Sequence, residues 1–355
     1  MKRALMLTAV MALFTTALSA YNPPVNGESF KELSSARANS GSLSVCGGGL
    51  FYSNPSSIYV NPALTSNQQR IDLNLGYTAM FSSNSSDSTT FGSAFQGAVI
   101  IPTKWTVITV LTNGVFVPFE SMDVNNTLNL KVNFAKEITD KLSVGLGIYS
   151  GVFWGADNDW SLGADLGFVY KVGDLGFLKD FRYGASVLNL GKNFDDTTAT
   201  PLKSGEKLSA FPTIATFKLG FSSTLVSTEF FKLGLSLDAT TPCFQNLIMD
   251  ACFECSFKDL IFINVGERFN MAEVLEGVKT SYIPSIGISC RFSFGFKNNS
   301  YMEKNGWSES ELATAVSYKQ IKGDINTVSA EFDLNLGAED TTPPVITLWL
   351  DEEDE

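Results

Sequence analysis

The sequence of 355 residues contains no histidine. This absence excludes Ser-His-Asp catalysis, Cys-His nucleophiles and zinc sites with histidine ligands. Beyond the first 20 residues there is no run of about 18 or more apolar residues, so no membrane-spanning helix is predicted. Charged residues make up only 17% of the chain, and the net charge of −12 argues against a nucleic-acid partner. We predict that the protein is not an enzyme and has no catalytic residue, metal or cofactor.

Cysteine is also scarce: the chain has five, at positions 46, 243, 252, 255 and 290. The odd number leaves at least one cysteine unpaired within the chain. Cys252 and Cys255 form a C-x-x-C pair, but in a strand residues three apart point to opposite faces. We therefore interpret them as wall residues of a sheet rather than as a metal or redox pair.

The N-terminus predicts an export signal over residues 1–20. Lys2 and Arg3 form a basic start, an apolar run follows to Leu18, and Ala17 to Ala20 is a zone of small residues. This order is typical of a secretory signal peptide, and the apolar run is too short for a membrane span. We expect an exported protein.

From Arg70 onward the dominant pattern is alternation with period two. In the segment 285–296 one face holds Ile286, Ile288, Cys290, Phe292, Phe294 and Phe296, and the other holds Ser285, Gly287, Ser289, Arg291, Ser293 and Gly295. Such alternation predicts β-strands with one apolar face. Together with 28 Phe, 29 Gly and few charges, it predicts an all-β fold, a transmembrane antiparallel β-barrel.

The pattern divides into fourteen predicted strands. They cover 70–81, 91–101, 104–116, 127–138, 141–154, 159–172, 181–190, 212–223, 230–240, 247–257, 260–269, 283–296, 311–321 and 326–336. Most are long enough to cross a bilayer at a tilt, which takes about 9–11 residues. The segment 308–321 also fits a helix, because Ser308 to Glu311 is a capping box.

An even number of strands places both termini on the periplasmic side, with residues 67–337 as the barrel. Short turns such as 102–103 and 139–140 would be periplasmic, and segments such as 191–211 and 270–281 would be outer loops. The acidic residues 338–355 are predicted to be a solvated periplasmic tail.

The stretch from Gly41 to Leu64 is irregular, rich in Gly, Ser, Asn and Pro, and yet carries many apolar side chains. Such a segment needs a protected place where its backbone polar groups find partners. A barrel of about fourteen strands is too wide to be filled by its own side chains. We predict that residues 21–66 form a hatch inside the barrel lumen, beginning with a short helix from a capping box at Ser29 through Arg37.

Arg37, the three glycines at 47–49 and the sequence Asn61-Pro62-Ala63-Leu64 stand in this order before the first strand. The order resembles the N-terminus of FadL-type outer-membrane long-chain fatty acid transporters, and the FadL-like proteins of treponemal spirochaetes are the most similar in overall organisation. The resemblance implies a hatch that ends in Asn-Pro-Ala and fourteen strands. The candidate hatch and gating residues are then Gly47, Gly48, Gly49, Asn61, Pro62 and Ala63. A simpler and compatible interpretation is that Asn61-Pro62 only turns the chain into the first strand.

A fatty acid needs an apolar cavity and one or two cations for its carboxylate. The strand positions opposite the apolar face offer four candidates: Lys131, Lys171, Lys232 and Arg291. Each is equally compatible with an ordinary charge in a polar barrel interior.

We therefore predict passive uptake of hydrophobic molecules, with long-chain fatty acids as the expected ligands, through a plugged barrel in the outer membrane. The alternatives are a general porin and a surface-exposed structural or secretion-associated barrel. The expected partners are the ligand, outer-membrane lipid and the outer-membrane assembly machinery, although Phe332 in the last strand is followed by a tail rather than by the chain end. We expect a monomer.

Overall fold

The computed structural model describes residues 31–85, 87–117, 119, 126–154, 158–192, 215–244, 246–276, 283–295, 309–321 and 323–339. The predicted signal segment and nearly all of the acidic tail lie outside these residues.

Short helical turns come first and strands follow. The turns are η1 (Lys31–Ser34), α2 (Ala36–Asn39), η2 (Pro55–Tyr59) and η3 (Pro62–Thr65). The strands are β1 (Arg70–Ser82), β2 (Phe91–Pro102), β3 (Val107–Phe116), β4 (Asn126–Glu137), β5 (Leu142–Trp154), β6 (Asn158–Leu175), β7 (Leu178–Lys192), β8 (Thr216–Ser227), β9 (Phe231–Pro242), β10 (Ile248–Phe257), β11 (Ile261–Asn270), β12 (Ser285–Phe294), β13 (Ser310–Ile321) and β14 (Ile325–Glu339). The helix α4 (Met271–Glu276) follows β11.

The strands form a closed antiparallel barrel in which each pairs with its neighbour in sequence. Closure is made by β1 and β14, which pair from Arg70 and Glu339 to Ser82 and Ile325. The fold class predicted from the alternating pattern is confirmed. Residues 310–321 are a strand, so the helical alternative for this segment is wrong: its small and apolar residues fill a gap between β12 and β14 and complete the ladder.

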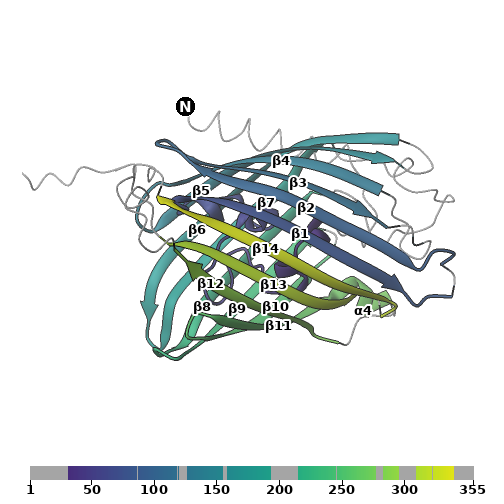
Figure 1. The fold of residues 1–355 in the computed structure, drawn as a ribbon. Coiled ribbons are helices and arrows are strands. Elements are labelled where there is room, and N and C mark those ends of the chain that lie inside the picture. The colour runs from purple at the N-terminus through teal and green to yellow at the C-terminus, as the bar shows by residue number, and fades with distance from the viewer. Residues whose placement is uncertain are drawn as a thin grey trace, which may run out of the picture.

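The two ends of the barrel differ. One end, which we call the turn end, holds Arg70 and tight connections such as 103–106 and 228–230. The other, the loop end, holds α4 and most of the longer connections, at the right in Figure 1, while the connection 295–309 between β12 and β13 lies at the turn end.

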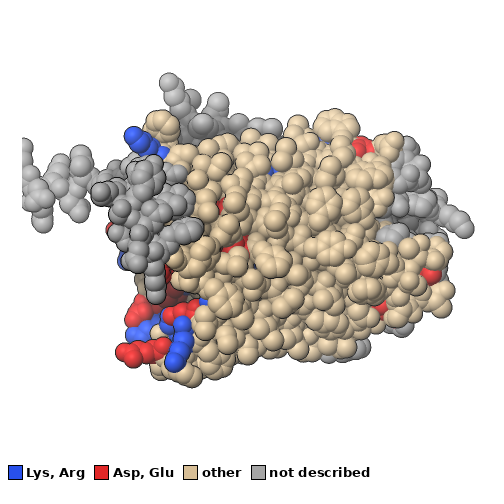
Figure 2. All heavy atoms as spheres, in the orientation of Figure 1, with Lys and Arg blue, Asp and Glu red and all other residues tan. Residues whose placement is uncertain are grey.

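The outer face of the barrel is apolar. Leu75 is 66% exposed, Trp160 52% and Ile288 47%, and Figure 2 shows a wall almost free of charged residues, which gather at the turn end on the left. Because exposed apolar side chains of this number are costly in water, this wall matches a bilayer. No helix in the described part of the chain is long and apolar enough to cross a membrane.

Aromatic side chains form contacts near both rims of this apolar wall. At the loop end Phe95 stacks on Phe116 at 5.7 Å between ring centroids, and at the turn end Phe231 lies 5.4 Å from Phe257. Girdles of aromatic residues at both interfaces are typical of barrels in outer membranes.

The segment from Lys31 to Thr65 lies inside the barrel, in purple in Figure 1. We call residues 31–66 the hatch. Wall glycines let its backbone approach closely: a Cβ on Gly145 would lie 2.2 Å from the carbonyl carbon of Pro62, and one on Gly234 would lie 2.3 Å from that of Gly49. The small residues of the alternating pattern therefore face the lumen, where the hatch takes up the space that side chains would fill.

The start of the hatch differs from the predicted single helix through Arg37. Ser35 interrupts it and becomes the N-cap of α2, accepting a bond from the backbone N–H of Ala38 at 3.4 Å while donating to Glu331 at 2.9 Å. A wall carboxylate thus breaks the helix into two short turns.

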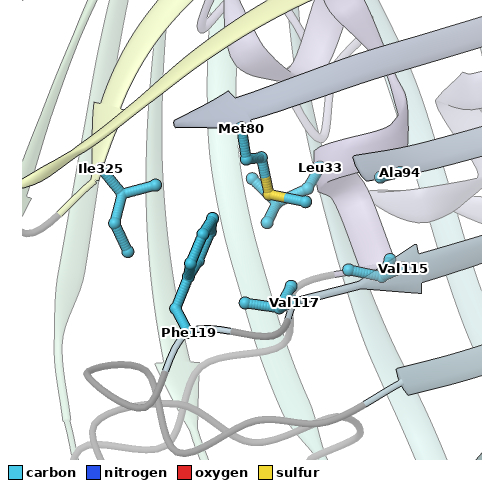
Figure 3. Close-up of a cluster of buried hydrophobic side chains, with 7 residues drawn as sticks. All are labelled: Leu33, Met80, Ala94, Val115, Val117, Phe119 and Ile325. Carbon is cyan, nitrogen blue, oxygen red and sulfur yellow. The ribbon is translucent and has the colours of Figure 1, made fainter. Parts of the chain in front are cut away.

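An apolar cluster at the loop end holds the first turn of the hatch. Leu33 packs among inward residues of four strands and of the chain after β3, as Figure 3 shows. The cluster consists of Leu33, Met80, Ala94, Val115, Val117, Phe119 and Ile325, all at most 3% exposed. Burial of these side chains stabilises the hatch in the lumen at this point.

Candidate functional site

A buried arginine of the wall holds the glycine loop of the hatch. Arg182 on β7 is 1% exposed and donates from Nε to the carbonyl of Cys46 at 2.9 Å and from Nη2 to that of Gly48 at 2.5 Å. Its charge is also paired with Asp180. Gly47 and Gly48 both have φ of +88°, a conformation that glycine adopts without strain. The predicted gating glycines thus form a tight loop whose carbonyls point at one guanidinium.

Two wall carboxylates hold the same loop from its N–H side. Asp238 on β9 accepts bonds of 2.8 Å from the backbone N–H of Val45 and from Oγ of Ser44. Glu254 on β10 accepts a 2.8 Å bond from the N–H of Leu50. Because buried charges are costly unless they are hydrogen-bonded, these contacts fasten the loop to the wall. We call Arg182, Asp238 and Glu254 the wall clamp.

The Asn-Pro-Ala motif lies next to the glycine loop, where η3 packs against β4, β5 and β6. Asn61 caps η3 by accepting a 2.9 Å bond from the N–H of Ala63. Its amide group also donates to the carbonyls of Val45 in the hatch and Phe168 in β6, at 2.8 and 2.9 Å. The motif therefore connects two parts of the hatch with the wall, in addition to turning the chain.

Glu331 on β14 is a third buried carboxylate of the wall, and it holds the start and the middle of the hatch. Besides Ser35 it accepts bonds from Ser56 at 2.7 Å and from Asn54 at 2.9 Å. Asn74 on β1 donates to it at 2.7 Å. Sequence reasoning missed Glu331 and the wall clamp. The signal in the sequence that could have identified them is a charged residue on the strand face that otherwise holds glycine and serine.

The four predicted lumen cations lie in different surroundings. Lys131 is buried and paired with Asp165 at 2.6 Å. Lys171 and Lys232 lie at the turn end, paired with Glu137 at 2.9 Å and Asp259 at 2.7 Å, and they contribute to neither of the two cavities described next. Arg291 on β12 makes no ion pair within the described part of the chain.

A cavity lies between the hatch and the strands β11 to β13, and we call it the hatch cavity. It is narrow, with a volume of about 30 Å³, and its lining includes Leu50, Phe262, Ala313, Ala315, Arg37 and Arg291. The guanidinium carbons of Arg37 and Arg291 each lie 4.3 Å from the ring centre of Tyr52. Nε of both arginines is buried without a hydrogen-bond partner. Arg37 has a carboxylate neighbour, Glu254, at 4.0 Å. The cavity thus combines apolar surface with two incompletely satisfied guanidinium groups.

A second cavity, the loop-end cavity, lies where the first turn of the hatch faces β3 to β11. Its volume is about 50 Å³, and its lining includes Lys31, Tyr59, Asn113, Asn129, Tyr149 and Thr240. Three further basic side chains here have carboxylate partners: Lys131 with Asp165, Lys218 with Glu32 at 3.1 Å, and Arg268 with Asp250 at 2.6 Å.

Lys31 differs from these three. Its ammonium donates to Oδ1 of Asn189 at 3.1 Å and lies 3.8 Å from the ring centre of Tyr149, without a carboxylate at ion-pair distance among the described residues. Burial lowers the pKa of Lys31 to about 7. The negative charge of Asp165 raises this pKa, and the positive charge of Lys131 lowers it further, but burial has the largest effect.

No protein-family model matches the chain, and no curated protein matches it. Among solved structures, it is similar to the toluene transporter TbuX of Ralstonia pickettii, with 12% identity and a TM-score of 0.49 over 89% of this chain and 99% of that one. The toluene transporter TodX of P. putida has 11% identity and a TM-score of 0.49, over 89% of this chain and 100% of that one. A Pseudomonas aeruginosa FadL homologue has 13% identity and a TM-score of 0.45, over 84% of this chain and 97% of that one.

The last of these structures is described as a homologue of FadL, the protein for which the family that the N-terminal motif resembles is named. Structural similarity at 13% identity or less does not identify a substrate. The proposed function is therefore based on the residues of this chain.

Proposed function

We propose that this barrel is an outer-membrane transporter for passive uptake of hydrophobic molecules, with long-chain fatty acids as the substrate class. The observation that carries the proposal is the hatch cavity, where apolar side chains lie beside the hatch together with Arg291, which has no ion pair among the described residues. A site for an amphiphile needs this combination, an apolar volume for the tail and a cation for the carboxylate.

The guanidinium of Arg291 favours an anionic head group at its own position in the hatch cavity, whose lining also holds the carboxyl groups of Glu254 and Asp333. The guanidinium of Arg291 is surrounded by Tyr52 and Phe262, at 4.3 and 5.0 Å from their ring centres, instead of by a carboxylate. A ligand carboxylate would accept hydrogen bonds from it in a partly dry environment, where charge-assisted bonds are strong. Its tail would lie along Leu50 and the small residues of β13.

The position of Arg37 connects ligand binding to the hatch. Arg37 lies 4.0 Å from Glu254, and Glu254 holds the N–H of Leu50. A ligand carboxylate at Arg37 competes with Glu254 for the same guanidinium, so ligand binding alters the contact that fastens the glycine loop. In this proposal Gly47, Gly48 and Gly49 move, and Asn61, Pro62 and Ala63 form the hinge between the hatch and the wall.

The proposal places the turn end in the periplasm, with an exported chain whose barrel is inserted by the outer-membrane assembly machinery as a monomer. The apolar outer wall and the tight connections at the turn end support this orientation, because outer-membrane barrels have short periplasmic turns and longer outer loops.

The test compares purified wild-type protein with Arg291→Gln and with Lys171→Gln, a variant that keeps the hatch cavity intact. We expect lipid mass spectrometry to find fatty acid in the wild type and in Lys171→Gln, and fatty-acid uptake into proteoliposomes to fall about tenfold or more in Arg291→Gln, since a hydrogen bond to a charged group contributes about 1.5–3 kcal/mol.

Two results would contradict the proposal. One is equal uptake by all three proteins. The other is a wild-type barrel that carries no lipid and conducts ions steadily in planar bilayers, which would identify a porin.

A further inference from the structure

We propose that the loop-end cavity is a second binding site, specific for a carboxylate group, with the ammonium of Lys31 and the side-chain amide of Asn129 as its main ligands. The inference rests on the proposed function only for the source of the carboxylate. The site itself is tested by binding, without transport.

Lys31 supplies the charge. It belongs to the hatch and is the basic group of this cavity that lacks a carboxylate partner among the described residues, whereas Lys131, Lys218 and Arg268 are paired. A buried ammonium held only by a carbonyl oxygen of Asn189 and by the face of Tyr149 is incompletely compensated. An anion at this point would restore the compensation.

Asn129 supplies the hydrogen bond. Its side chain is 3% exposed and lines the same cavity, and neither its Nδ2 nor its Oδ1 has a hydrogen-bond partner. It lies on β4 next to Asn113 of β3, whose amide donates to the backbone carbonyl of Lys31 at 3.4 Å, so Asn129 and Lys31 occupy the same side of the lumen. An unsatisfied buried amide costs about 1–3 kcal/mol, which a bound ligand would recover.

The charge of the lining selects a group with a single negative charge. The site offers one unpaired cation, while Glu32 and Asp165 also line it. A carboxylate neutralises Lys31, but a phosphate dianion would add repulsion from these two acids. The hydroxyl of Thr240 on the far wall is also buried without a partner and adds a polar contact for the remainder of a small acid.

Binding at this site has a pH signature. The charged or titratable groups that face Lys31 across the cavity are Glu32, Tyr59, Lys131, Tyr149, Asp165, Lys218 and Arg268. Since the pKa of Lys31 is lowered to about 7, the ammonium is present below that pH and is lost as the pH rises. The carboxyl group of the ligand has a pKa far below 7, so it stays ionised over the whole of this pH range. Its affinity should therefore fall above pH 7, by up to about tenfold per unit, and binding at pH 7.5 should take up a proton.

The experiment is isothermal calorimetry with hexanoate and with decanoate at pH 6.5 and 8.5, in a non-ionic detergent. An Arg291→Gln background removes the hatch cavity from the measurement, so that failure of this site is distinguished from failure of the proposed transport. Lys31→Gln and Asn129→Leu should each weaken binding, the former about tenfold or more. Lys31→Arg should keep the affinity and abolish its pH dependence, because arginine stays charged. Lys171→Gln is the matched control and should bind as the background does.

Equal affinity for both acids would identify small organic acids as the source of the carboxylate, and binding of decanoate alone would identify the head group of an amphiphile. The proposal is overturned if the background protein binds neither acid, or if Lys31→Gln and Asn129→Leu bind as tightly as it does. A Lys31→Arg protein with the pH dependence of the background would also overturn it.

Discussion

The two sides of the hatch meet the barrel wall in different ways. Toward β7, β9 and β10 the glycine loop is held by the wall clamp, in which Arg182, Asp238 and Glu254 each bond to hatch backbone at 2.9 Å or less. Toward β11 to β13 the wall presents small residues such as Ala313 and Ala315. The hatch cavity lies between part of the hatch and this wall, while Ser40 packs closely on Gly287 beside it. One side fastens the hatch, and the other leaves room beside it.

This difference indicates on which side of the hatch a transport path through the barrel opens most easily. Detaching the clamp side removes the backbone donors of Asp238 and Glu254 and the backbone acceptors of Arg182, which costs several kcal/mol. On the cavity side the wall contributes no such clamp, and a ligand there can improve the surroundings of Arg291. The easiest displacement of the hatch is therefore the one that begins at the cavity side.

The largest expected effect comes from removing the fastened segment altogether. Replacing residues 41–60 by a glycine-serine linker of equal length removes the glycine loop and η2 while keeping the chain continuous. A closed barrel should become a steadily conducting one, because the fourteen-stranded wall cannot fill its own lumen. Single-channel recording in planar bilayers measures this. Unchanged conductance would show that the hatch does not seal the barrel.

Arg182→Ala should have the next largest effect, since it leaves the carbonyls of Cys46 and Gly48 buried without donors. We expect a loss of about 2–5 kcal/mol in the free energy of unfolding and brief openings to ions. Urea unfolding in lipid vesicles and bilayer recording are the measurements. Lys179→Ala, which removes an exposed ion pair of the same strand, serves as the control and should leave the stability almost unchanged. If both variants behave alike, the wall clamp is not what fastens the hatch.

The smallest expected effect on stability belongs to the cavity side. Ala315→Leu adds a side chain in the hatch cavity, where the space exists, so the free energy of unfolding should change by less than about 1.5 kcal/mol. Fatty-acid retention, measured by lipid mass spectrometry, should nevertheless be lost, and ion conductance should stay closed. Full retention of lipid in a folded Ala315→Leu barrel would place the ligand elsewhere.

The wall was predictable because its chemistry repeats locally. Alternation such as that of Ile286, Ile288 and Cys290 against Ser285 and Gly287 determines which face meets lipid, whatever the neighbouring strand is. The strand β14 extends to Glu339, three residues past the predicted strand end at Leu336, because pairing with β1 continues to Arg70. The position at which a strand ends depends on its partner strand and cannot be predicted from the local alternation of residues.

The site was less predictable. Lys131 and Arg291 were both recognised as lumen cations, but only the register shows that Lys131 meets Asp165 whereas Arg291 meets Tyr52. Lys31 and Asn129 were missed because neither stands in a motif. Their significance comes from the absence of partners in a shared cavity, which is a property of the assembled lumen.

By itself, the sequence determined that this chain forms an all-β barrel with an apolar wall and a glycine-rich segment before it, because periodicity, glycine content and low charge act through local physical preferences. Only the tertiary structure decided which charges are neutralised and which are left to a ligand. Ion pairs and cavities arise between strands and hatch segments far apart in the chain, and the distances that decide them exist only once the barrel has closed around the hatch.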